Sequence, residues 1–151
     1  FKGDKLILGH VGDSRCYRFR AGKLEQITKD HSLLQEQIDA GLISPEQAAN
    51  SSIKNLVTRA LGVEDTVLLE VNEHDIAPGD LYVLCSDGLP DMVEDAAIAR
   101  IVASDSSLEQ RTNQLVNAAN ENGGRDNISV LMVEVSELAE KRGLIARLLG
   151  K

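Results

Sequence analysis

Three aspartates stand beside glycine-containing turns at points where an apolar, strand-like run begins or ends. Asp13 lies in GHVGDSR after one such run, Asp87 lies in CSDG after another, and Asp126 lies in GGRDN before a third. Glycine allows a sharp turn and a close approach by other groups. A carboxylate on such a turn is held by a rigid sheet and stays open to solvent at the sheet's edge.

Carboxylates that converge in one place repel one another unless a cation lies between them. Hard divalent cations such as Mg²⁺ take oxygen ligands and keep several waters, and the cysteines and histidines here do not have zinc-site spacing. If the three aspartates converge, the sequence predicts a Mg²⁺ or Mn²⁺ site. Each aspartate alone is equally typical of an ordinary turn, in which the side chain accepts a hydrogen bond from its own backbone.

The composition is that of one soluble domain. The chain has 151 residues, 42% of them apolar and 26% charged, with a net charge of -8. This charge argues against a nucleic-acid or anionic-membrane partner, and no apolar run reaches the roughly 20 residues that span a bilayer. Cys16 and Cys85 both fall in apolar runs, which indicates buried thiols of a cytoplasmic protein rather than a disulfide.

Strand patterns alternate with turn signals along the first third of the chain. Runs at 6–11, 16–20 and 24–28, with a tight turn at 21–23, predict a β-meander. Further strands are expected at 67–74, at 81–85 and in the segment NISVLMVEV. This last run is apolar almost throughout, which predicts a strand buried on both faces.

Helical patterns occupy the intervening segments. A first helix is expected from Leu33 and ends at Gly41, and Ser44 with Gln47 forms a capping pair for a short second one. Two amphipathic helices follow at 94–103 and 108–122. Together the elements predict an α+β layered sandwich with mostly antiparallel sheets.

Four segments in this order resemble the PPM-type metal-dependent serine/threonine phosphatases, also called type 2C, in their compact bacterial form: GHVGDSRCYRFRAGKLEQITKDHSL, NLVTRALG, GDLYVLCSDGLPDMV and GGRDNISVLMVEV. The resemblance implies a four-layer αββα sandwich with two antiparallel sheets. Residues 1–135 then form the C-terminal portion of one phosphatase domain. Residues 33–54 match a flap beside the active site. Beyond the resemblance, the pattern of residues 136–151 predicts a helical tail.

The resemblance also implies the chemistry. Two Mn²⁺ or Mg²⁺ ions activate a water that attacks phosphoserine or phosphothreonine, with Asp87 and Asp126 as ligands of one ion. Asp13 matches a ligand of a third, weaker ion. The groups expected to support these ligands, through backbone or side chain, are Gly88, Asn127, Gly12 and Ser86.

The family's N-terminal motifs have no counterpart among these residues. They carry an acidic residue, a metal-bridging aspartate-glycine pair, a general-acid histidine and a phosphate-binding arginine. Because the chain begins with Phe1 inside a strand-like pattern, we expect a fragment that by itself binds metal weakly and is inactive. A separate N-terminal segment or a second copy is the expected partner for its sheet edges.

The histidines and arginines receive other interpretations. We expect His10 to pack in the core or at a strand edge, His31 to serve as a cap or flap contact, and His74 to lie at an exposed strand end. Arg15, with Ser14, is interpreted as structural, and Arg125 as an exposed loop residue.

Two other functions fit parts of the sequence. One is a non-catalytic PPM-like module that regulates a kinase or binds a phosphoprotein. The other is a phospho-receiver domain, which needs a parallel sheet that the hairpin at 21–23 disfavours. For the phosphatase itself, the expected partners are phosphoserine and phosphothreonine proteins and a cognate serine/threonine kinase or its targets.

Overall fold

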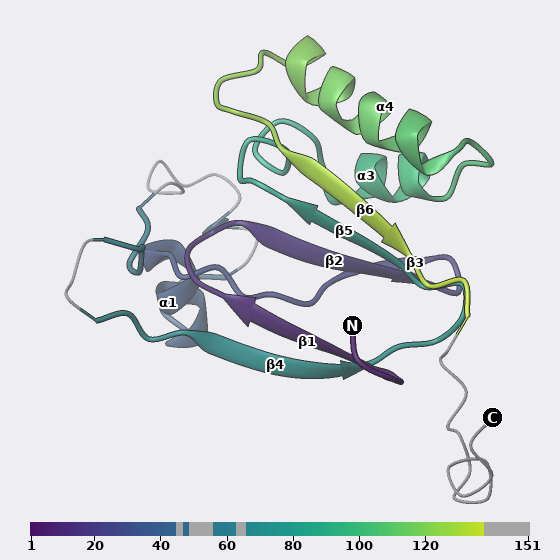
Figure 1. Ribbon diagram of the computed structural model, residues 1–151. Helices are drawn as coiled ribbons and strands as arrows, with labels where there is room; N and C mark the ends of the chain where they lie inside the picture. Colours follow the sequence, from purple (N-terminus) through teal and green to yellow (C-terminus); the bar gives the residue numbers. More distant parts are fainter. Residues whose placement is uncertain (45–46, 49–55, 63–65, 138–151) are drawn as a thin grey trace, which may run out of the picture.

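The structure is a computed structural model that describes residues 1–44, 47–48, 56–62 and 66–137. Its elements, in chain order, are β1 (Lys5–His10), β2 (Arg15–Arg20), β3 (Lys23–Gln26), α1 (Leu33–Asp39), β4 (Glu70–Asp75), β5 (Leu81–Cys85), α3 (Asp95–Val102), α4 (Leu108–Glu121) and β6 (Val130–Glu134) (Figure 1). Within the described ranges, every helix is too short or too polar to cross a membrane.

The strands form two antiparallel sheets. One has four strands in the order β3-β2-β5-β6, and the other consists of β1 and β4. Helices α3 and α4 cover one face of the larger sheet, and β1 and β4 lie on its other side (Figure 1). The α+β prediction with two antiparallel sheets is confirmed, and the parallel sheet of a receiver domain is not present among the described strands.

The core is divided by the larger sheet into two clusters. On β5, Leu81, Val83 and Cys85 point into the cluster shared with α3 and α4. Tyr82 belongs instead to the cluster between the two sheets. Because side chains alternate between the faces of a strand, β5 has no outward polar face, which explains why its sequence is continuously apolar.

The two cysteines lie in different clusters. Cys85 packs toward the helices and Cys16 packs between the sheets, and both are buried and free. Burial raises the pKa of Cys16 to about 11 and that of Cys85 to about 12, so both are protonated thiols at neutral pH. The prediction of buried thiols is confirmed.

Local signals place the helix ends correctly. In α4, the Ser107 side chain accepts from the Gln110 amide while the Gln110 side chain accepts from the Ser107 amide, which is a complete capping box. The predicted pair Ser44 and Gln47 makes the same reciprocal bonds. Most of the flap beyond Ser44 lies outside the described residues, as do residues 138–151 of the predicted helical tail.

The predicted meander is wrong at its first connection. β1 pairs with β4, with His10 opposite Glu70, whereas β2 pairs with β3 and β5. Gly12 has a φ of +98° and turns the chain out of one sheet and into the other. The hairpin at 21–23 is confirmed.

The prediction that the last strand is buried on both faces is also wrong. Met132 is buried, but Leu131 is 59% exposed. Val133 and Val135 on the same face as Leu131 pack into the cluster between the sheets. Among the described residues, the smaller sheet therefore covers the end of β6 but not its beginning.

Candidate metal centre

The chain leaves β5 and enters β6 through two loops that are bonded to each other. The Ser86 amide donates to the Ser129 carbonyl at 3.1 Å, the Ser86 hydroxyl donates to the Asn127 carbonyl at 2.8 Å, and the Ser129 amide donates to the Ser86 hydroxyl at 3.0 Å. Asp87 follows Ser86, and Asp126 precedes Asn127. The two aspartates therefore lie at the same end of neighbouring strands.

Gly88 is required at this junction by sterics. A Cβ atom at position 88 would lie 2.6 Å from the Asn127 carbonyl oxygen and 3.1 Å from its carbon. A Cβ atom is essentially never found 2.6 Å from a carbonyl oxygen, so the glycine lets the two loops pack directly against each other. The predicted supporting residues Ser86, Gly88 and Asn127 are thus in mutual contact beside the two aspartates.

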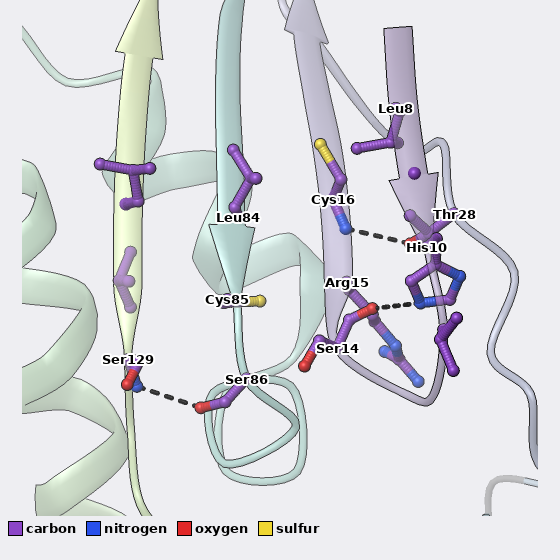
Figure 2. Close-up of a pocket in the computed structure, with 14 residues that line it drawn as sticks. Leu8, His10, Ser14, Arg15, Cys16, Thr28, Leu84, Cys85, Ser86 and Ser129 are labelled. Carbon is purple, nitrogen blue, oxygen red and sulfur yellow. Dashed lines mark hydrogen bonds between the residues drawn. The ribbon is translucent and has the colours of Figure 1, made fainter. Parts of the chain in front are cut away.

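Asp13 reaches the same edge from the turn between β1 and β2. Figure 2 shows its neighbour Ser14 at the same strand ends as Ser86 and Ser129. Burial raises the pKa of Asp13, and the negative charge of Asp87 raises it further. Asp13 and Asp87 therefore lie close enough for their negative charges to repel each other.

Among the described residues, no cationic side chain pairs with the carboxylates at this edge. Within the described ranges, no lysine or arginine nitrogen lies within 4.0 Å of Asp13, Asp87 or Asp126. Asp87 accepts a bond from the Gly88 amide at 2.9 Å, and Asp126 accepts one from the Asn127 amide at 2.6 Å. Uncompensated carboxylates of this kind fit a divalent cation.

The three aspartates do not form one closed ligand set. Among the described residues, the group of three potential ligands whose atoms all lie within 4.8 Å of one another is His10, His31 and Glu70. The aspartates are spaced more widely than that. Such spacing suits an ion whose shell is completed by waters or by further ligands.

Two further acidic residues act on this edge and were not identified from the sequence. The charges of Asp30 and Asp91 also raise the pKa of Asp13. The Asp91 amide donates to the Asp87 carbonyl at 3.0 Å, so one turn of backbone brings Asp91 close to Asp87. The spacing of four residues in DGLPD was the available signal.

The structural interpretation of Arg15 is supported by its contacts. Its Nε donates to both oxygens of Asp30, at 3.1 and 3.0 Å, and its Nη2 donates to Oδ2 at 2.7 Å. Burial lowers the pKa of Arg15, but the hydrogen bonds that Arg15 donates to Asp30 raise it overall. Arg15 is therefore committed to an internal ion pair, and Arg125 is exposed as expected.

The histidines differ from expectation in part. His10 is buried, as predicted for a core position. His31 is also buried, but it is not the helix cap, because the residue that caps α1 is the next one, Ser32. The His31 carbonyl accepts a hydrogen bond from the Thr58 amide at 2.7 Å. His74 does lie next to the last residue of β4, but the predicted exposure is wrong, because the side chain is half-buried and its Nε2 atom is buried.

Known sequences match this chain over most of its length. The family Protein phosphatase 2C matches residues 1–128. A serine/threonine phosphatase of Listeria innocua is 40% identical over 130 residues, which are 86% of this chain and 52% of that protein. The protein phosphatase PhpP of Streptococcus pneumoniae is 38% identical over 134 residues, which are 89% of this chain and 54% of that protein. The chain thus spans about half the length of the curated relatives it matches.

Solved structures show the same fold. The serine/threonine phosphatase of S. agalactiae superimposes with a TM-score of 0.84 at 38% identity, over 89% of this chain and 55% of that one. The catalytic domain of the phosphatase PstP, in complex with two manganese ions, superimposes with a TM-score of 0.80 at 36% identity, over 91% and 56%.

Proposed function

This chain belongs to the protein phosphatase 2C family, and we propose that it contributes to the hydrolysis of phosphoserine and phosphothreonine on proteins. The observation that carries the proposal is the sheet edge where Asp87 and Asp126 lie on loops bonded to each other and Asp13 lies near enough to feel the charge of Asp87. The manganese-bound relative makes Mn²⁺ the first ion to test; Mg²⁺ is the alternative with the same oxygen preference.

Each aspartate has a separate role in this proposal. Asp87 and Asp126 would hold one ion of a binuclear centre, and Asp13 would help to hold a third. When bound, the ions would supply the positive charge that neutralises the phosphate and activates water for attack on the phosphoryl group.

The protein's own residues supply rigidity. Asp87 is fixed because β5 is hydrogen-bonded on both sides, to β2 and to β6. Gly88 keeps the loops before β6 and after β5 in contact. Without bound cations, the carboxylates would repel a phosphate dianion, so the same residues that hold the ions also make binding of the substrate depend on them.

The chain spans about half the length of its curated relatives, and we propose that further ligands of the ions come from the rest of the family domain. We propose that residues 1–135 belong to one catalytic domain and that the polypeptide by itself binds Mn²⁺ weakly and turns over little substrate. The substrates are phosphoproteins, and the natural opponent is a serine/threonine kinase. Two free, buried thiols suit the reducing cytoplasm.

Mn²⁺ titration by calorimetry tests the metal centre. The chain is titrated alone and again after mixing with the remaining part of the family domain from one of its relatives. We expect tight binding only in the mixture, together with Mn²⁺-dependent release of phosphate from a phosphothreonine peptide. Tight binding by the chain alone would contradict the shared centre.

Two substitutions assign the ligands. Asp87→Asn and Asp126→Asn should each abolish phosphate release by the mixture, whereas Asp105→Asn, in the exposed turn between α3 and α4, should not change it. Activity that survives in both Asp87→Asn and Asp126→Asn would overturn the proposed function.

A further inference from the structure

Two histidines hold the turn that carries Asp13, one on each side of it. The Gly12 amide donates to His31 Nδ1 at 3.1 Å, and the His31 amide donates back to the Gly12 carbonyl at 2.9 Å. On the other side, His10 Nε2 donates to the Ser14 carbonyl at 2.7 Å (Figure 2). The two imidazole rings lie against each other with their centroids 4.8 Å apart.

Glu70 fixes the orientation of the His31 ring. Its Oε2 lies 2.9 Å from His31 Nε2, and its Oε1 accepts from the Asn72 amide group at 2.6 Å. The bond with His31 lowers the pKa of Glu70, so the carboxylate is charged at neutral pH. A charged carboxylate can only accept, which places the His31 proton on Nε2 and leaves Nδ1 free to accept from Gly12.

The same three groups have the types and the spacing of a transition-metal site, because the ligand atoms of His10, His31 and Glu70 all lie within 4.8 Å of one another. Their hydrogen bonds favour a different role. A metal-binding histidine donates its second ring N–H to an acceptor, whereas the second ring nitrogen of His31 accepts a hydrogen bond from the Gly12 amide. Binding a metal through Nε2 would place two N–H groups against each other.

We propose that His10 and His31, with His31 oriented by Glu70, are positioning residues that keep Asp13 turned toward the Asp87 side of the sheet edge. This inference rests on the proposed function, because it assigns the cluster to the ion that Asp13 helps to hold. The cluster lies where β1 ends and the antiparallel β4 begins, with His10 opposite Glu70. It links the smaller sheet to a ligand at the edge of the larger one.

Two substitutions of one residue separate the two bonds of the His31 ring. Asparagine at position 31 keeps an oxygen near the place of Nδ1 and loses the reach to Glu70. Glutamine keeps the reach to Glu70 and loses the acceptor for Gly12. A matched pair, His31→Asn and His31→Gln, therefore tests which bond matters for Asp13.

The readout is broadening of backbone resonances by Mn²⁺ in the isotopically labelled 151-residue chain, which detects weak binding and needs no turnover. In His31→Gln, we expect the Mn²⁺ concentration that half-broadens Asp13 to rise about tenfold. His31→Asn should leave that concentration unchanged, and neither substitution should change it for Asp126. Thermal melts of both variants check that they fold equally well.

Each other result has a defined meaning. Equal responses of Asp13 in the two variants, or no broadening of Asp13 in the unmodified chain, would overturn the positioning role. Shifts of the imidazole resonances of His10 and His31 at micromolar Zn²⁺ would also overturn it and identify a separate metal site. Loss of broadening at Asp87 and Asp126 alone would count against the proposed function and not against this inference.

A variant that leaves the ring in place provides a second test if His31→Gln does not fold. Glu70→Ala removes the anchor of the ring and should weaken Mn²⁺ broadening of Asp13. Glu70→Gln retains an oxygen that can accept from Nε2 and should behave like the unmodified chain. Weakening by both Glu70 variants alike would show that the carboxylate's charge, and not its hydrogen bond, acts on Asp13.

Discussion

The two ends of strand β5 carry aspartates with opposite surroundings. Asp80, which precedes the strand, is 1% exposed and accepts from Arg20 Nε and Nη2, both at 2.6 Å, from the Ala77 amide at 2.8 Å and from the Tyr82 hydroxyl at 3.2 Å. Asp87, beyond the other end, is half-buried and bonds to the amide of Gly88, its own neighbour.

The pKa values of carboxyls at the two ends shift in opposite directions. Burial raises the pKa of Asp80, but the bonds from Arg20 and Ala77 outweigh it, so the pKa lies below its ordinary value. At the other end, burial raises the pKa of Asp13, and the charge of Asp87 adds to the increase.

This difference shows how a structural aspartate differs from a candidate ligand. At Asp80, the chain itself supplies the cation, and the carboxylate is saturated with donors. At the other end, like charges are gathered without a cationic side chain in the described structure, so a cation from solution has a place to bind. Burial and charge thus distinguish the two ends, although the residue type is the same.

The largest effect should come from removing the saturated carboxylate. Asp80→Ala leaves the Ala77 amide and the Tyr82 hydroxyl without their acceptor and Arg20 without its partner, so we expect a loss of about 3 kcal/mol in the free energy of unfolding. Urea denaturation measures it. Asp87→Ala in metal-free buffer should change the same quantity by less than about 0.5 kcal/mol. Similar losses in the two variants would remove the distinction between the ends.

A substitution at Gly88 tests whether the end of β5 that carries Asp87 depends on the contact between the two loop backbones. Gly88→Ala forces a Cβ against the Asn127 carbonyl, 2.6 Å away, and should cost about 1–3 kcal/mol. Gly9→Ala is the matched control, because its Cβ would lie 3.6 Å from the Leu69 side chain, an ordinary contact. Chemical denaturation of both variants checks the prediction, which is contradicted if Gly9→Ala costs as much as Gly88→Ala.

A substitution at Asp13 tests whether charge repulsion at this sheet edge lowers the stability of the metal-free protein. Because its pKa is raised by folding, the metal-free protein loses stability as pH rises from about 4 through that raised pKa. Asp13→Asn removes this loss, so the variant should melt at a higher temperature than the unmodified chain at about pH 7 and at the same temperature at about pH 3.

Asp80 contributes with the opposite sign, since its lowered pKa gives stability that is lost as pH falls below about 4. Added Mn²⁺ should reverse the order of the melting temperatures at neutral pH, because the ion stabilises the unmodified chain more than Asp13→Asn. An unmodified chain that melts above Asp13→Asn without metal would contradict the repulsion at this end.

The smallest effect is expected from an exposed carboxylate that forms an ion pair with a lysine. Lys5 lies 2.7 Å from Asp75 and lowers its pKa, yet the pair is exposed on the smaller sheet. Asp75→Asn should therefore leave the melting temperature unchanged within error. A clear decrease would show that a nearby cation, rather than burial, determines the importance of Asp80.

Local features of the sequence determined much of this protein. The hairpin at 21–23, the capping pair of Ser44 and Gln47, the buried thiols and the position of the aspartates at strand ends were all predicted correctly. Each depends on residues within a few positions of one another: turn chemistry, caps and hydrophobic periodicity act over that range.

Only the tertiary structure decided the long-range partners. The pairing of β1 with β4, the arginine that saturates Asp80 from 60 residues away and the meeting of His31 with Glu70 each join distant segments. Among the described residues, the smaller sheet does not cover Leu131, which is exposed. An apolar strand or a lone carboxylate has the same local pattern whatever lies against it, so its partner depends on how distant segments pack together.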